Sequence, residues 1–148
     1  MYKTILIPID GSTLSLKAAR AGIELAGVTG AKVTALHVMA PYAPAYAGEG
    51  MFYSNAFTED QYIATMRANA DKILAKVDAL ASKAQVECAK QAIFSDTPWE
   101  GIIKTAGKLK CDTIVMASHG RSGLAGIVIG SQTNRVLTHS KIPVLVCR

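Results

Sequence analysis

Short apolar runs rich in β-branched residues alternate along this chain with segments whose apolar residues recur at helical spacing. The runs have the length of buried strands, and the spacing between them fits crossover helices. We expect strands at residues 3–9, 32–39, 85–94, 112–116 and 141–147, and helices at 14–26, 59–84, 97–110 and 131–139. This alternation predicts an α/β fold, an open five-stranded parallel sheet with right-handed crossovers and helices on both faces.

Glycine, proline and capping residues predict where several helices begin and end. Gly27 and Gly30 follow the first helical pattern and supply stop signals. Thr97, Pro98 and Glu100 predict a capping box, with the threonine as N-cap, the proline at the first helical position and the glutamate three residues after the cap.

Residues 40–57 are rich in Pro, Gly, Ala and aromatic residues and show neither period, which predicts a long loop. The amphipathic stripe of the helix after it, including Met66, and the single Trp99 are expected in the core. The loop is expected to expose four aromatic side chains, those of Tyr42, Tyr46, Phe52 and Tyr53.

The composition is that of one globular domain spanning residues 1–148, with 50% hydrophobic and 18% charged residues. Cys88, Cys111 and Cys147 form no C-x-x-C pair, so a secreted disulfide framework is not expected. The N-terminal apolar stretch is too short for a signal peptide, and no uninterrupted apolar run reaches the length of a membrane span. We therefore expect a cytoplasmic protein that makes no contact with a membrane.

The net charge of +5, from 16 basic and 11 acidic residues, directs attention to anionic partners. The lysines are scattered, with no basic run and no interleaved aromatic residues. A nucleic-acid partner is therefore not expected.

In an open parallel sheet, ligands bind outside the carboxyl ends of the strands. Three segments are predicted to meet there, namely residues 8–12, 36–39 and 117–131. The third carries Gly120, Gly123, Gly126 and Gly130 and delivers Ser131 to a helix N-terminus, where a phosphate is favoured. The alternative is a plain strand-to-helix connection in which Ser131 caps the helix. No Walker loop or dinucleotide fingerprint is present.

For four polar residues near these segments, a role in a ligand or catalytic site is weighed against a structural or solvent-exposed role. Asp10 either accepts hydrogen bonds from a ribose or caps the first helix. His37 is expected to be a satisfied core residue, because no carboxylate or cysteine accompanies it at ligand spacing. His119 lies beside Ser118 without an orienting carboxylate, which argues against a catalytic triad. Arg121 reaches a phosphate or faces solvent.

Three stretches resemble the universal stress protein family: Y-K-T-I-L-I-P-I-D-G-S, L-H-V and M-A-S-H-G-R-S-G-L-A-G-I-V-I-G-S. The resemblance covers the whole chain. Its most specific element is a phosphate-binding motif of glycine, two residues, glycine, nine residues, glycine and Ser or Thr. Gly120, Gly130 and Ser131 match this motif, and Ala117 stands where the nucleotide-binding branch usually has its first glycine.

The resemblance implies a Rossmann-like sheet with strand order 3-2-1-4-5 and a site for ATP, ADP or AMP. In that site Asp10 lies beside the ribose and the backbone of Val38 recognises the adenine. Gly120, Gly130 and Ser131 hold the phosphates. The expected site is completed by Pro8, Met116, Ala117, His119, Arg121 and Gln132. The methyl group of Ala117 fits if the backbone φ of this residue is negative. It obstructs the site if the ligand must pass close to the Cα atom of this residue.

The resemblance also implies a homodimer, formed through the C-terminal strand at residues 142–147. No general base is positioned by the sequence, so the leading hypothesis is a regulatory nucleotide in a stress response, with at most slow ATP hydrolysis. Whether Mg²⁺ or Mn²⁺ accompanies the phosphates stays open. The alternatives are a dimeric interaction module that binds no nucleotide and an ATPase or phosphotransferase that uses His119.

Overall fold

The structure, a computed structural model, describes residues 2–43, 58–119 and 129–148. Its strands are β1 (Thr4–Pro8), β2 (Lys32–Met39), β3 (Cys88–Phe94), β4 (Thr113–Ala117) and β5 (Val144–Cys147). Its helices are α1 (Thr13–Thr29), α2 (Glu59–Lys83), α3 (Pro98–Lys108) and α4 (Ser131–His139). All described strand pairs are parallel and their order is β3-β2-β1-β4-β5, which confirms the predicted fold class and strand order.

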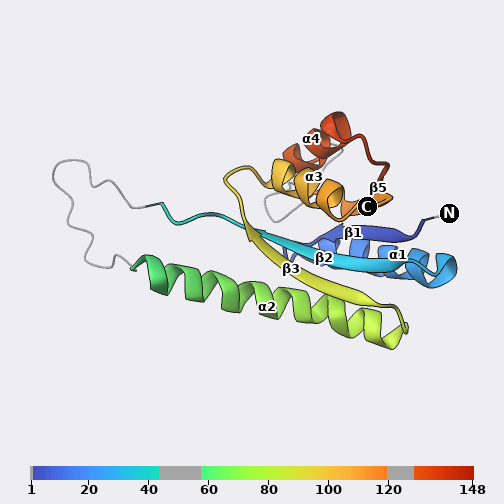
Figure 1. The fold of residues 1–148 in the computed structure, drawn as a ribbon, viewed down its shortest axis with the longest axis horizontal. Coiled ribbons are helices and arrows are strands. Elements are labelled where there is room, and N and C mark those ends of the chain that lie inside the picture. Colours follow the sequence, from blue (N-terminus) through green and yellow to red (C-terminus); the bar gives the residue numbers. More distant parts are fainter. Residues whose placement is uncertain (1, 44–57, 120–128) are drawn as a thin grey trace.

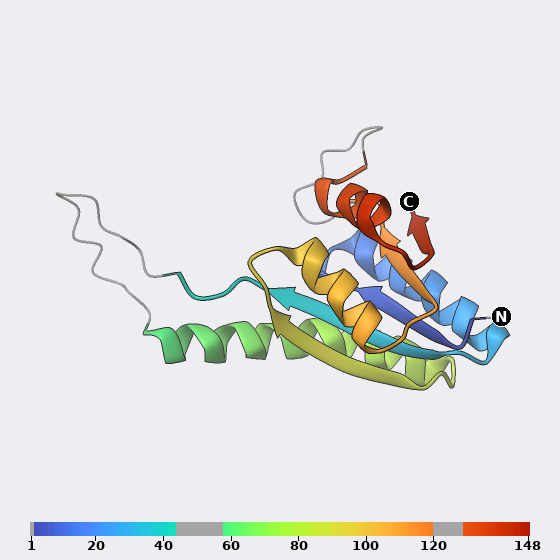
Figure 2. The same ribbon diagram turned by 45° about the horizontal axis from the view of Figure 1, so that its top comes forward.

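Helices α1 and α2 cover one face of the sheet, and α3 and α4 cover the other (Figures 1 and 2). Ile5 and Ile7 of β1 pack with α1 and α2 on one face, whereas Leu6 between them packs with α3 and α4 on the other. All three side chains are fully buried. Burial on both faces is the reason that the central strands are continuous apolar runs.

Helix α1 approaches the sheet closely at Gly22. A Cβ built on Gly22 would lie 2.6 Å from Cδ1 of Ile7 and 3.4 Å from Cβ of Val115. Glycine at this position therefore allows the helix backbone to pack directly over β1 and β4.

The first helix continues through Gly27, so the expectation that Gly27 helps to end it is wrong. Gly30 ends the helix in the left-handed conformation, with φ of 70°. An interior glycine costs a helix about 1 kcal/mol but does not terminate it, whereas the left-handed cap favours glycine.

The capping box predicted at α3 is also wrong. Thr97 makes no side-chain cap hydrogen bond, although Pro98 does occupy the first turn. Glu100 pairs instead with Lys104, one turn further along the helix, at 3.1 Å. A capping box is present at α2, where Thr58 and Gln61 exchange side-chain-to-backbone hydrogen bonds of 3.3 and 3.0 Å.

Strand boundaries shift where a turn or proline intervenes. The third strand begins at Cys88 rather than at residue 85, because Gln85 has a left-handed φ of 56°. The last strand begins after Pro143, at Val144. Ala117, expected in the loop, is the last residue of β4.

The apolar stripe of α2 belongs to the core only from Ala70 onward. Tyr62, Ile63 and Met66 are half-buried, because the first half of the helix extends past the sheet (Figure 1). The expectation that Met66 is a core residue is therefore wrong. Trp99, the second residue of α3, is also half-buried. It packs at the margin of the core that α3 and α4 cover.

His37 is a satisfied core residue, as predicted. It is 8% exposed, and its Nδ1 lies 2.7 Å from the carbonyl oxygen of Ile9. The three cysteines are free thiols. None of the described helices has the length and apolarity that a membrane span requires.

Candidate functional site

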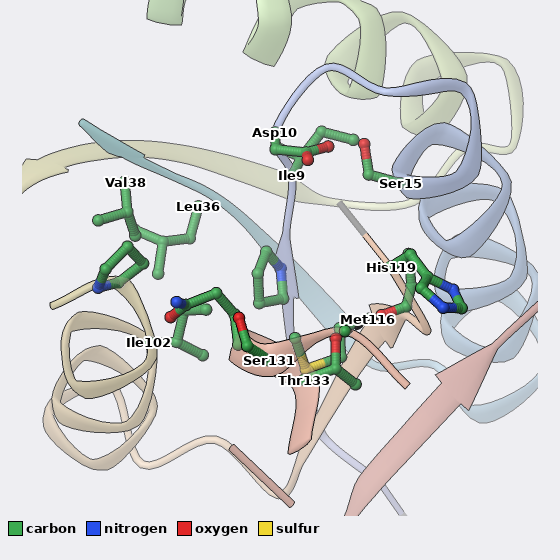
Figure 3. Close-up of a pocket in the computed structure, with 15 residues that line it drawn as sticks. Ile9, Asp10, Ser15, Leu36, Val38, Ile102, Met116, His119, Ser131 and Thr133 are labelled. Atoms are coloured by element: carbon green, nitrogen blue, oxygen red, sulfur yellow. Dashed lines mark hydrogen bonds between the residues drawn. The ribbon is translucent and has the colours of Figure 1, made fainter. Parts of the chain in front are cut away.

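A cleft of about 410 Å³ opens at the carboxyl ends of β1, β2 and β4 (Figure 3). From β1 the chain crosses to α1 on one face of the sheet, and from β4 it continues to α4 on the other. The cleft therefore lies at the topological switch point of the sheet, the place where open α/β sheets bind ligands.

One wall of the cleft is apolar. Leu36 and Val38 of β2 lie on one side of it with Ile102 of α3 (Figure 3), and Pro98 at the start of α3 also lines it. Such a wall suits a flat, weakly polar group rather than a charged one.

Asp10, just beyond β1, contributes a carboxylate to the opposite side of the cleft (Figure 3). Its Oδ1 accepts a hydrogen bond from the backbone N–H of Ser12 at 3.0 Å. The N-cap of α1 is Ser12, whose Oγ accepts from the N–H of Ser15 at 3.1 Å. The capping reading of Asp10 is therefore wrong, and its carboxylate remains at the cleft.

The N-terminus of α4 also faces the cleft. Its N-cap is Gly130 and no side chain caps it, so the reading in which Ser131 caps the helix is wrong. The helix is anchored to the end of β4, because Gly130 N–H donates to the Ser118 carbonyl at 2.7 Å. N–H groups without side-chain caps and the helix dipole make this end a favourable position for an anion.

The first turn of α3 meets α4 at the same cleft. The side-chain Oε1 of Gln132 accepts a hydrogen bond from the backbone N–H of Trp99 at 3.1 Å. Two helix N-termini therefore converge on the cleft, and one of them is capped from the other helix.

His119 lines the cleft on the side away from Val38 and Leu36 (Figure 3). Its Nδ1 lies 3.0 Å from Oγ of Ser118, and its buried Nε2 has no hydrogen-bond partner among the described residues. Its partner at Nδ1 is a hydroxyl, which does not orient a histidine as a triad carboxylate does.

The backbone at Ala117 does not have a positive φ, as its methyl group requires. It pairs with Cys147 in the sheet, and the non-glycine residues with positive φ in the described ranges are Gln85 and Lys110. Alanine therefore fits this backbone without strain.

The cysteines are unsuited to nucleophilic chemistry. Burial raises the pKa of the thiols of Cys88, Cys111 and Cys147 above their ordinary value. These thiols therefore stay protonated near neutral pH. The described residues also contain no group of three or more His, Cys, Asp or Glu side chains able to hold a metal ion.

The structure brings most of the sequence-predicted residues together. Around the cleft lie Pro8, Asp10, Val38, Met116, Ala117, His119, Gly130, Ser131 and Gln132. Gly120 and Arg121 lie outside the described residues, as do Gly123, Gly126 and most of the 40–57 loop with Tyr46, Phe52 and Tyr53. The remaining aromatic residue of that loop, Tyr42, is half-buried rather than exposed, with its ring 5.5 Å from that of Tyr62.

Sequence reasoning missed Ser15, Pro98, Ile102 and Thr133, which also line the cleft. Pro98 had a usable signal, since it opens the helix that follows β3 at the same edge of the sheet. Ser15, Ile102 and Thr133 sit inside helical patterns, where nothing distinguishes them from packing residues.

The chain is similar to proteins of one known family. The model of the universal stress protein family matches residues 1–148. Universal stress protein MJ0531 of Methanocaldococcus jannaschii is 32% identical over 151 residues, which cover 100% of this chain and 83% of that relative.

Two solved structures share the fold. One is a universal stress protein in complex with cAMP, with a TM-score of 0.71 and 23% identity, covering 99% of this chain and 97% of that one. The other is the universal stress protein from Archaeoglobus fulgidus in complex with dAMP, with a TM-score of 0.71 and 18% identity, covering 99% and 98%. On its family match and its fold, this chain belongs to the universal stress protein family.

Proposed function

We propose that this chain binds an adenine nucleotide, ATP or its products ADP and AMP, in the cleft at the carboxyl ends of β1, β2 and β4. The observation that carries the proposal is the pairing of an apolar wall with two unlike polar ends, the Asp10 carboxylate and the N-terminus of α4. The cAMP and dAMP held by two structures of the same fold support the choice of an adenine ligand.

Each part of a nucleotide has a chemically matching part of the cleft. The base packs on the wall of Leu36, Val38 and Ile102. The ribose hydroxyls donate hydrogen bonds to Asp10, because a carboxylate is an acceptor. The phosphates lie at Gly130 and Ser131, since the helix N-terminus attracts the anion that Asp10 repels.

The nucleotide acts as a regulatory ligand in a stress response rather than as a substrate. Apart from Asp10, the charged or ionisable side chain lining the described cleft is His119, whose described partner is the Ser118 hydroxyl. Phosphoryl transfer needs positioned cations and a group that orients the nucleophile. Occupancy then shifts the population of the conformations that a partner recognises.

The test is to strip the purified protein of ligand and titrate it with ATP, ADP and AMP by calorimetry. Gly130→Val is the informative variant, because φ of −58° and ψ of 149° accept a side chain without strain. The expected result is binding by the parent chain and at least a tenfold loss in Gly130→Val, about 1.4 kcal/mol.

The matched control is Gly107→Val on α3, where an added Cβ meets no atom within 4 Å. It should bind the nucleotides like the parent chain. Absence of binding by the folded parent chain at millimolar nucleotide overturns the proposal, and the interaction module without a nucleotide becomes the function to pursue.

The proposal includes a cytoplasmic homodimer paired through β5. Within the described sheet β5 is an edge strand that pairs with β4, and Leu145 on it is 45% exposed. An exposed apolar edge is a site at which a second chain adds its own strand.

A further inference from the structure

The side chain of Gln132 joins the first turns of two helices that are separate in sequence. Its Oε1 accepts the hydrogen bond of Trp99 N–H at 3.1 Å, and Gln132 itself is the second residue of α4. Thr97, the residue at the N-cap position of α3, makes no side-chain cap hydrogen bond. Gln132 therefore supplies from α4 the cap that α3 lacks.

This contact fixes which end of the carboxamide is available to a ligand. A backbone N–H only donates, so the atom facing Trp99 is the oxygen, and the NH₂ group is left without a partner in the described part of the chain. Gln132 lines the cleft. Its oxygen is bonded to Trp99, which directly follows Pro98, a residue of the apolar wall. Gln132 is an exposed residue, so its NH₂ group is open to a ligand that fills the cleft.

We infer that Gln132 is a positioning and specificity residue: it latches α4 to α3 and presents its amide donors to a ring-nitrogen acceptor on the nucleobase. This inference rests on the proposed function of the cleft. A base with an acceptor nitrogen facing the Gln132 NH₂ group gains a hydrogen bond. A base with C–H at that position leaves the NH₂ group unpaired, and a base with N–H there places two donors against each other.

Trp99 is held to α4 at a second point, which makes the latch observable. Its ring packs against that of His139 in a tilted arrangement, with centroids 4.6 Å apart and planes inclined by 37°. It is the single tryptophan of the chain. Its emission therefore reports the position of α4 relative to α3 without any label.

The first measurement tests the latch without a ligand, by amide hydrogen exchange at Trp99. N–H groups in a first helical turn are normally unprotected, so protection here depends on Gln132. Gln132→Met should speed exchange of this amide about threefold to tenfold and shift the Trp99 emission. Gln132→Glu retains an acceptor and should keep the amide protected.

The second measurement tests base recognition with AMP and its three deaza analogues, in which carbon replaces N1, N3 or N7. One analogue should bind the parent chain about threefold to tenfold more weakly than AMP. That penalty should vanish in both Gln132→Met and Gln132→Glu, because neither side chain donates a hydrogen bond. All four ligands carry the same phosphate, so charge repulsion by the glutamate cancels in their ratios.

The inference is overturned if Gln132→Met leaves exchange at Trp99 unchanged, or if every deaza penalty is the same in the parent chain and the variants. If AMP still binds in either case, the proposed function stands. If AMP binds neither parent nor variants, the proposed function fails and this assignment fails with it.

Discussion

The hydroxyl of Thr133 donates a hydrogen bond to the carbonyl oxygen of Ala117 at 2.8 Å, and both residues are buried. This bond ties the first turn of α4 to the last residue of β4. It therefore sets where the N-terminus of α4 lies at the cleft.

Replacing Thr133 by valine keeps the shape of the side chain and removes the donor. The Ala117 oxygen then loses a buried partner, and the free energy of unfolding should fall by about 1–3 kcal/mol. Denaturant titration measures the change. Thr138→Val on the same helix is the control, since its hydroxyl bonds to Asn134 at an exposed site and its loss should be smaller. Equal losses in the two variants would contradict a special role for the bond to Ala117.

Ala117→Gly restores the glycine found at this point in the motif that the chain resembles. Ala117 is a strand residue without positive φ, so glycine should lower the free energy of unfolding by about 0.5–1 kcal/mol. Nucleotide affinity should stay within about twofold, because the backbone is already in a conformation that alanine adopts. Calorimetric titration checks this. Tenfold tighter binding by the glycine variant would mean that the methyl group obstructs the ligand.

Asp112 gives the protein a predictable acid sensitivity. Its carboxylate accepts hydrogen bonds from the N–H groups of Lys3 and Thr4 at 2.6 and 2.8 Å, and these bonds lower its pKa below the ordinary 3.8. Its contribution to stability is therefore present above about pH 3.8 and is lost as the pH falls through the lower folded pKa.

The Asp112→Asn variant should be less stable than the parent chain near neutral pH, and the difference should shrink in acid. Thermal unfolding between about pH 7 and pH 2 measures this convergence. Asp71→Asn, at an exposed position on α2, serves as the control. A constant gap between Asp112→Asn and the parent chain over this range would contradict the assignment.

Leu145→Lys tests the proposed dimer. A lysine on an edge strand opposes the addition of a second strand, so sedimentation velocity should show a dimer for the parent chain and a monomer for the variant. Val28→Lys, at an 84% exposed position on α1, should remain dimeric. A parent chain that is already monomeric, or a Leu145→Lys dimer, would contradict pairing through β5.

The α/β class and the place of the site could be predicted from the sequence because they depend on local patterns. Continuous apolar runs such as residues 113–117 mark strands buried on both faces, and parallel strands bring their carboxyl ends to one edge. For this reason Asp10, Val38 and Gly130 were expected at one cleft, and the last helix was predicted with the bounds that the structure has, Ser131–His139.

Only the tertiary structure decided how the first turn of α3 is satisfied. Ser12 and Thr58 cap α1 and α2 next to them in sequence, whereas α3 receives its cap from Gln132 across 33 residues of chain. A capping rule reads neighbours in sequence, whereas a backbone N–H bonds to whichever acceptor the packing places within reach. The sequence by itself therefore determined the sheet, its helices and the edge where the candidate cleft lies. The packing of α3 against α4 determined which atoms face that cleft, because side-chain orientation depends on contacts that no local pattern encodes.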